Sequence, residues 1–195
     1  MNLFINALSE NWKIILFNES REIISEKDIK ILWNESEKLI WFIDDFLNEN
    51  NLEYRNIENI VVASWPWSFT WIRTIVLMVN TINFVINKNI TSLNYFDLFD
   101  NYPIIKASSK RDSFLKKSKN SEVEIIKNDD IIEYIKENNI TTIYWENKNI
   151  TILLTNNSNS VEILENINYC NIIKNIEFQN NKKIEPIYIK KPSIG

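Results

Sequence analysis

The stretch SWPWSFTWIRT, residues 64–74, places three tryptophans within eight positions. It follows a β-branched run, residues 57–64, which we expect to be a buried strand, and precedes residues 70–87, which we expect to be a mostly buried helix. A turn between such elements normally uses glycine, because no Cβ intrudes and positive φ is open to it. The chain has a single glycine, Gly195, where average usage would give about 14.

Composition limits the class of protein. The 195 residues are 45% hydrophobic, which is enough for one large domain or two lobes. One cysteine, Cys170, allows no internal disulfide, and the longest apolar runs, residues 39–43 and 75–79, are too short to span a bilayer. The chain shows no pattern typical of a signal peptide. We therefore expect a cytoplasmic protein without membrane contact.

Charge and histidine content exclude several kinds of site. The net charge of −4 and the pI of about 5.1 give no broad basic face, so direct tight binding to nucleic acid is not expected. Because the chain has no histidine, histidine triads and HExxH zinc sites are excluded. One basic run is interpreted as a solvated strand face rather than a binding patch: Lys106, Lys110, Arg111, Lys116, Lys117 and Lys119.

The first half of the chain reads as β-β-β-α-β-α-β-α. Strands are expected at residues 2–8, 13–18 and 21–26, with a turn at 10–12 between the first two. A helix over 36–50 has Ser36 as its expected N-cap. After the strand and helix that flank the quoted stretch, the pattern predicts a short strand at 89–91 and a helix at 92–100.

The second half repeats this order in shortened form. Strands are expected at 102–108, 112–118 and 122–127, a helix at 128–139, and a strand at 140–145; the pattern is weaker at 149–155 and 160–167. Two such halves match an α/β, actin-like fold of the sugar-kinase and Hsp70 type, with each lobe a mixed sheet of β-β-β-α-β-α type. We expect an N-terminal lobe over 1–101 and a reduced C-terminal lobe over 102–195.

The quoted stretch also carries a family signature. With glycine at each tryptophan, the residues Pro66, Ser68, Phe69, Thr70 and Arg73 would read within GPGSFTGIR. That sequence closely resembles the motif of the TsaB (YeaZ-like) family, an accessory subunit of bacterial tRNA threonylcarbamoyladenosine synthesis. The family carries the motif between a hydrophobic strand and a buried helix, which is the setting predicted above.

Two further segments support the resemblance. The closing segment IEPIYIKKP, residues 184–192, is similar to the end of family members. The helix at 36–50 carries family-like residues at Ser36, Glu37, Leu39, Ile43, Asp44 and Leu47. The resemblance covers residues 1–115 and then little until the last dozen.

The resemblance implies a non-catalytic scaffold without metal or cofactor. Such a subunit pairs its first lobe with TsaD, the catalytic subunit, helps to recruit the ATPase TsaE, and meets tRNA only through the complex. The complex modifies the adenosine next to the anticodon, and the subunit can form a homodimer when alone. The motif loop, comprising Trp65, Pro66, Trp67, Ser68, Phe69, Thr70, Trp71 and Arg73, is the candidate binding element.

The helix at 36–50 is the second candidate for partner contact. Ile40, Ile43 and Leu47 share one face, which could pack on the sheet or on a partner helix. Trp41 and Phe42 lie off that face and are the better candidates for exposure.

The tryptophans allow two interpretations. Scarce glycine and excess tryptophan coincide at motif positions, so we hypothesise that the gene reads UGA as glycine and that seven glycines are written as tryptophan. Trp12, Trp33 and Trp145 also stand at expected turns or element ends, whereas Trp41 lies within a helix. In the alternative, real indoles form an aromatic cluster or a partner-binding patch.

An actin-like small-molecule kinase or ATPase is the alternative function. Such enzymes anchor the metal of a nucleotide through an aspartate near the first strand, but this chain has Asn6-Ala7-Leu8-Ser9 there and Ser108-Ser109-Lys110 at the corresponding place in the second half. The adjacent pairs Asp44-Asp45 and Asp129-Asp130 do not share a helix face and are interpreted as solvated residues. A peptidase ranks last, because no histidine is present to activate Ser68.

Overall fold

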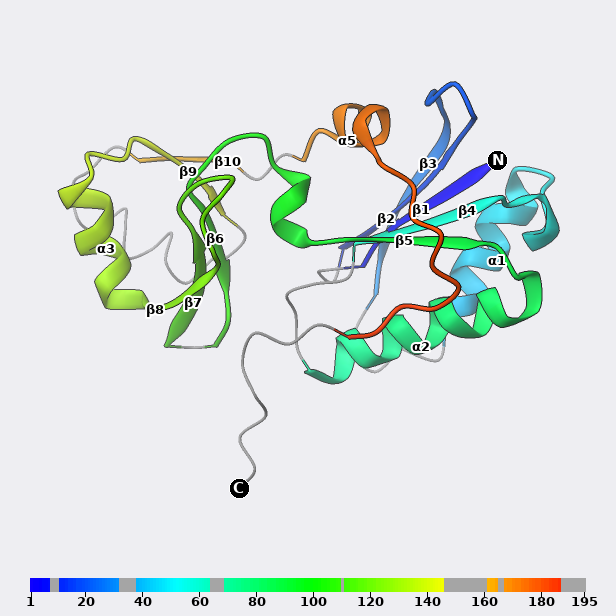
Figure 1. Ribbon diagram of the computed structural model, residues 1–195, viewed down its shortest axis with the longest axis horizontal. Coiled ribbons are helices and arrows are strands. Elements are labelled where there is room, and N and C mark those ends of the chain that lie inside the picture. The colour runs from blue at the N-terminus through cyan, green and yellow to red at the C-terminus, as the bar shows by residue number, and fades with distance from the viewer. Residues whose placement is uncertain are drawn as a thin grey trace. The chain divides into compact units, whose positions relative to one another are not determined.

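The computed structural model describes residues 1–7, 11–31, 38–63, 69–109, 111–145, 161–164 and 167–186. The chain divides into two compact units, Met1–Tyr95 together with Tyr169–Gly195, and Phe96–Asn168. This division differs from the expected single boundary at 101/102, because the chain returns to the first unit after residue 168. Each unit holds one five-stranded mixed sheet (Figure 1).

The sheet of the first unit has the strand order β3-β2-β1-β4-β5. Its strands are β1 (Asn2–Asn6), β2 (Asn11–Phe17), β3 (Ile23–Lys30), β4 (Asn59–Ala63) and β5 (Asn89–Leu93). β1 pairs antiparallel with β2 and parallel with β4, which in turn pairs parallel with β5. Every residue of β1 is buried, as a central strand covered on both faces requires.

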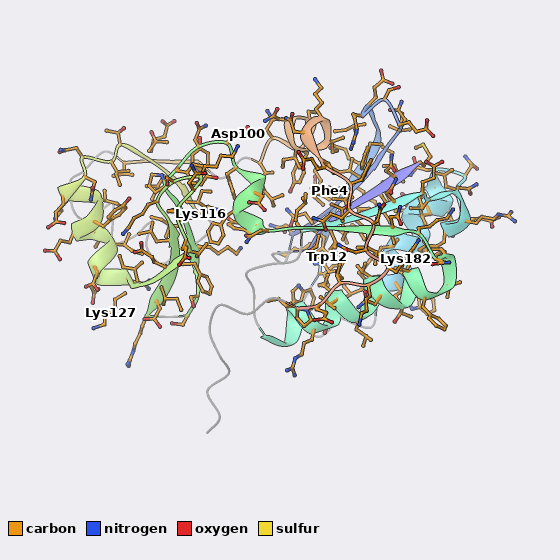
Figure 2. All side chains as sticks on the ribbon, viewed as in Figure 1. Phe4, Trp12, Asp100, Lys116, Lys127 and Lys182 are labelled. Carbon is orange, nitrogen blue, oxygen red and sulfur yellow. The ribbon has the colours of Figure 1, made fainter. Side chains whose placement is uncertain are left out.

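Two helices pack on one face of this sheet. α1 (Leu39–Glu49) connects β3 to β4, and α2 (Phe69–Ile86) connects β4 to β5. Both connections join parallel strands and progress toward the β5 edge. Since such crossovers are right-handed, both helices are placed on the same face. Trp12 of β2, labelled in Figure 2, is fully buried. It meets Trp71 of α2 edge-on, with 6.0 Å between the ring centroids.

The opposite face is covered by α5 (Tyr169–Asn175), which the sequence did not predict. The Tyr169 ring packs edge-on against Phe4 at 5.7 Å between centroids, and its hydroxyl accepts a hydrogen bond of 2.7 Å from Nδ2 of Asn6. Figure 1 shows α5 and α2 on opposite sides of the sheet. The sheet of the first unit is therefore the middle layer of three.

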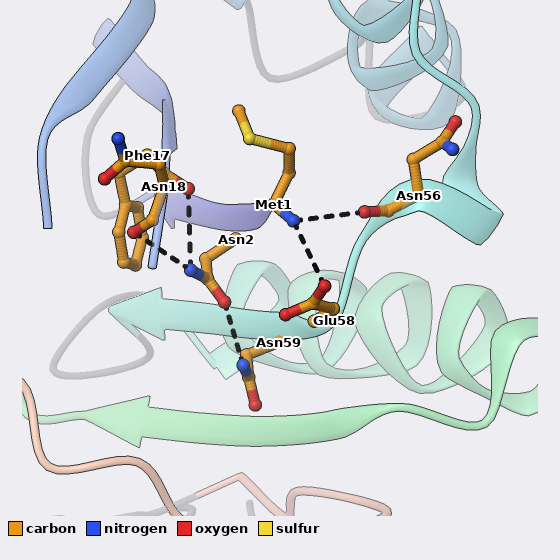
Figure 3. A network of polar contacts seen from close by, with 7 residues as sticks. All are labelled: Met1, Asn2, Phe17, Asn18, Asn56, Glu58 and Asn59. Atoms are coloured by element: carbon orange, nitrogen blue, oxygen red, sulfur yellow. Dashed lines mark hydrogen bonds and ion pairs between the residues drawn. The ribbon is translucent and has the colours of Figure 1, made fainter. Parts of the chain in front are cut away.

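A polar network joins the beginnings of β1 and β4 to the end of β2 (Figure 3). Nδ2 of Asn2 donates to the carbonyls of Phe17 and Asn18 at 3.5 and 3.4 Å. Oδ1 of Asn2 accepts a hydrogen bond of 2.8 Å from Asn59. The Asn2 side chain is buried, so these bonds satisfy an amide that would otherwise oppose folding.

The second unit has the strand order β10-β9-β6-β7-β8. Its strands are β6 (Ile104–Ala107), β7 (Asp112–Lys116), β8 (Glu124–Lys127), β9 (Thr142–Trp145) and β10 (Glu162–Leu164). The helix α3 (Asn128–Glu137) packs on the sheet around a core of Ile105, Leu115, Ile131, Ile135 and Ile143. The strands and the helix expected from 102–145 are thus confirmed.

Some expected boundaries are wrong. Asn11 and Trp12 belong to β2 rather than to a turn. The helix expected at 92–100 is only a short 3-10 helix, η3 (Tyr95–Leu98). α1 begins at Leu39, after Lys38, with no side-chain cap, and the expected N-cap Ser36 lies outside the described residues, as does the segment 149–155. Within the described parts of the chain, no helix has the length and apolar content needed to cross a bilayer.

Candidate partner interface on helices α1 and α2

α2 carries more apolar surface than one face can bury. Its buried side includes Trp71, Ile75, Val79 and Ile82. On the other side Leu77, Phe84 and Val85 are 69%, 90% and 80% exposed. Positions 77, 81, 84 and 85 follow helical spacing, so these three side chains lie along one stripe. We call Leu77, Phe84 and Val85 the α2 stripe.

α1 divides its apolar residues between the core and the solvent. Ile43 and Leu47 are buried, so of the two alternatives open to them they take the core position. Trp41 is 72% exposed and Ile40 is 42% exposed. The expected exposure of Trp41 is confirmed, whereas Phe42 is only partly exposed. Ile40 and Trp41 are therefore the α1 side chains that remain available to a partner.

A hollow of about 550 Å³ joins the two helices. Asp44 and Asn48 line it from α1, and Val85 and Ile86 line it from α2. Ile40 stands one turn before Asp44 on the same face of α1. Val85 of the α2 stripe therefore lines this hollow, whereas Trp41 lines a second one with Lys38, Phe42 and Asp45. We call Ile40, Trp41 and the α2 stripe the helical face.

The 3-10 helix η2 (Tyr54–Asn56) forms the polar end of this hollow. Burial and the nearby Asp44 carboxylate raise the pKa of Tyr54 to about 12, so its hydroxyl stays protonated. That hydroxyl donates to the carbonyl of Ile40 at 3.5 Å. Glu53 and Arg55 pair with each other at 2.9 Å. No ion pair joins Asp44 to any residue that the structure describes, so its carboxylate remains available at the rim.

The motif loop is described only in part. Trp65, Pro66, Trp67 and Ser68 lie outside the described residues, and the backbone of Phe69 and Thr70 forms the first turn of α2. Trp71 is buried, and its indole N–H donates to the carbonyl of Ala7 at 2.9 Å, so it cannot serve as a surface contact. Arg73 is exposed one turn into the helix.

The described residues contain no cluster of metal ligands. No group of three or more cysteine or acidic side chains among them is arranged to hold an ion. At the end of β1, Asn6 bonds Tyr169. Asp44, Asp45, Asp129 and Asp130 are exposed, as expected for solvated carboxylates.

The basic run is not one solvated face. Lys106 is fully buried, because side chains alternate along β6 and Lys106 shares a covered face with the opposing Phe114. Arg111, Lys117 and Lys119 are exposed, and Lys117 pairs with Glu124 at 2.8 Å. Lys110 lies outside the described residues.

Solved structures with the same fold are known. An uncharacterized protein with similarity to peptidase YEAZ from Pseudomonas aeruginosa superposes on this chain with a TM-score of 0.71 and 9% identity. The match covers 97% of this chain and 100% of the other protein. YeaZ from Pseudomonas aeruginosa matches 66% of this chain and 68% of its own, with a TM-score of 0.56 and 12% identity. The chain has a YeaZ-like fold. No family model and no curated protein matches the sequence.

Sequence reasoning missed the α2 stripe. Residues 70–87 were expected to form a mostly buried helix, and 11 of these 18 residues are apolar. Leu77 and Val85 lie two turns apart on the side opposite the buried residues. A helix covering one face of a sheet buries only part of its circumference, so apolar residues on more than one side of this helix could have indicated a second contact surface.

Proposed function

We propose that the protein is the non-catalytic, TsaB-like scaffold subunit of a tRNA threonylcarbamoyladenosine-forming complex. The helical face pairs with a TsaD-like catalytic subunit, and the pair recruits a TsaE-like ATPase. The tRNA meets this chain only through the complex, in the cytoplasm. The two sheets are two actin-like lobes, of which the second is reduced.

The exposed helical face is the observation that carries this proposal. Burying one large apolar side chain contributes about 1.5–3 kcal/mol, so the exposed Leu77, Phe84 and Val85 leave several such contributions unrealised. Large exposed apolar side chains gathered on neighbouring helices are typical of protein interaction sites. The YeaZ-like fold and the motif-like residues Pro66, Ser68 and Thr70 support a TsaD-like partner.

The alternative, an actin-like kinase or ATPase, has weaker support. Its chemistry calls for a carboxylate near the end of the first strand, and this chain has Asn6, whose amide is bonded to Tyr169. Stabilisation of the isolated chain by magnesium and ATP would favour the enzyme, because a ligand at 100 times its dissociation constant adds about 2.7 kcal/mol.

Co-purification with a TsaD-like subunit tests the proposal. The wild-type chain should elute with the partner, and Phe84→Glu should abolish the complex, because it places a charge in the apolar contact. Ile24→Glu is the matched control, since Ile24 is 55% exposed but lies on β3. Failure of the folded wild-type chain to bind, or equal binding by Phe84→Glu, would contradict the proposal.

A further inference from the structure

The edge strand β5 of the first unit is covered by a segment from the far end of the chain. Residues 176–186, which we call the strap, run along β5 and then along α2 (Figure 1). Its two buried side chains, Ile176 and Ile184, stand at either end, and residues 177–183 between them are exposed. The strap forms an isolated antiparallel bridge between Asn181 and Ile90 and no regular strand.

The strap supplies acceptors to backbone donors at the free edge of β5. The amide of Ile90 donates to the carbonyl of Asn181 at 2.7 Å, and the amide of Ser92 donates to Oε1 of Gln179 at 3.3 Å. The backbone of Gln179 donates in return to the Thr91 hydroxyl at 2.9 Å. Unpaired donors on an edge strand are a template for a strand of another chain, and here they are occupied.

Two asparagines of α2 hold the strap by its backbone. Asn80 bonds both the N–H and the carbonyl of Ile184, each at 2.9 Å. Asn83, one turn later, donates to the carbonyl of Lys182 at 2.8 Å. The amides contact main-chain groups two residues apart, which is the repeat of an extended chain. They fix the position of the strap without depending on its exposed side chains.

The other end of the strap is held by the loop before β3. Arg21 donates to the carbonyl of Ile176 at 3.0 Å, and its guanidinium stacks 4.1 Å above the Phe178 ring centroid. Phe178 in turn stacks on Phe17 with ring centroids 6.4 Å apart. The strap is therefore fixed at both ends, with its exposed middle over the edge of β5.

We propose that the strap is a removable cover that keeps the β5 edge from pairing with a second copy of this chain. Side-chain amides and two end anchors hold it in place of a continuous ladder, so it can open without melting the sheet. The β5 edge is not part of the helical face, although Asn80, which holds the strap, stands one turn before Phe84 on α2.

The test uses the full chain carrying Phe84→Glu, which removes association through the helical face. In this background Asn80→Ala with Ile184→Asp opens the strap, and Lys183→Ala is the control, because Lys183 pairs at the surface with Glu185. Hydrogen exchange at the amides of Ile90 and Ser92 should rise about tenfold, as expected for losing a hydrogen bond, while β1 and β4 keep their protection. Light scattering should show new self-association.

Three results would overturn the proposal. Hydrogen exchange at Ile90 and Ser92 could stay unchanged in the opened variant, which would show that the strap does not protect these amides. Exchange could also rise equally across β1 and β4, which would show that the strap is part of the core and cannot open separately. The opened variant could also remain monomeric with both amides exposed, which would remove the protective role. If Asn80→Ala with Ile184→Asp fails to fold, Ile184→Ala alone gives the same readouts.

Discussion

Trp12 is the residue whose surroundings fit its side chain least well. Its indole is fully buried in β2, and its N–H finds no acceptor among the described residues. A buried donor left unsatisfied costs about 1–3 kcal/mol. Trp71, by contrast, donates to Ala7. The hypothesis that UGA is read as glycine removes both indoles, and with them the orphaned donor of Trp12.

The recoding hypothesis predicts the covalent composition of the native protein. Peptide sequencing by mass spectrometry of protein from its own cells should find glycine at positions 65, 67 and 71. The gene should carry TGA at those codons. Tryptophan in the native peptides, or TGG codons at the three positions, would reject the hypothesis and leave Trp12 and Trp71 as genuine core residues.

Tyr54 makes stability depend on alkaline pH. Burial, and then the Asp44 carboxylate, raise the pKa of Tyr54 from 10.0 to about 12 in the folded chain. The unfolded chain loses this proton first, so the stabilising contribution is complete below pH 10 and disappears as the pH rises through about 12. Denaturant unfolding at several pH values should show stability falling across this window.

Tyr54→Phe is the comparison for that measurement. The variant should lose less stability between pH 10 and 12 than the wild-type chain, and the highest tyrosinate step should be missing from its ultraviolet titration. Identical pH profiles for the two proteins would show that Tyr54 titrates as an ordinary exposed tyrosine.

Within the single helix α1, some side chains belong to the core and others are available to a partner. Ile43 is fully buried and Trp41 is exposed, although they lie two residues apart. Ile43→Ala should reduce the free energy of unfolding by about 2–5 kcal/mol, because it leaves a cavity. In the chain as written, with tryptophan at position 41, Trp41→Ala should change this free energy by no more than about 0.5 kcal/mol but weaken binding of the TsaD-like subunit.

Denaturant unfolding and partner titration of both variants check this separation. The core variant should bind normally under conditions where it is folded. Large destabilisation by Trp41→Ala, or unchanged binding, would remove Trp41 from the interface.

Elements with strong local patterns could be predicted from the sequence, and those that depend on distant contacts could not. The alternating or β-branched runs of β1, β4 and β7 and the apolar run of α2 were recognised. α5 was missed because its position depends on Tyr169 contacting Phe4 and Asn6, which are 163 or more positions away in the sequence. Trp12 was read as a turn residue because its pairing with Ile29 has no local signal.

The whole molecule is organised by the return of the chain to the first unit. A boundary at 101/102 followed from reading two successive halves, but Asn6–Tyr169 and Asn83–Lys182 join residues 163 and 99 positions apart. Neither contact leaves a periodic pattern in the sequence. The candidate site could also be predicted only in part. Trp41 was expected to be exposed, but the exposure of Leu77, Phe84 and Val85 could be recognised only once the buried side of α2 was known.

Fold similarity at 9–12% identity does not establish the function of the molecule. The function has to be inferred from its surfaces. We propose the helical face as the contact for the catalytic partner and the strap as protection of the β5 edge. These two surfaces predict different patterns of protection when the partner binds.

Hydrogen exchange of this chain with and without the TsaD-like subunit tests the central claim most directly. The account predicts new protection in α1 and α2, extending to η2 at the end of the hollow, and unchanged exchange in β6, β7 and β8. Protection confined to the second unit, with α1 and α2 exchanging as in the free chain, would contradict it.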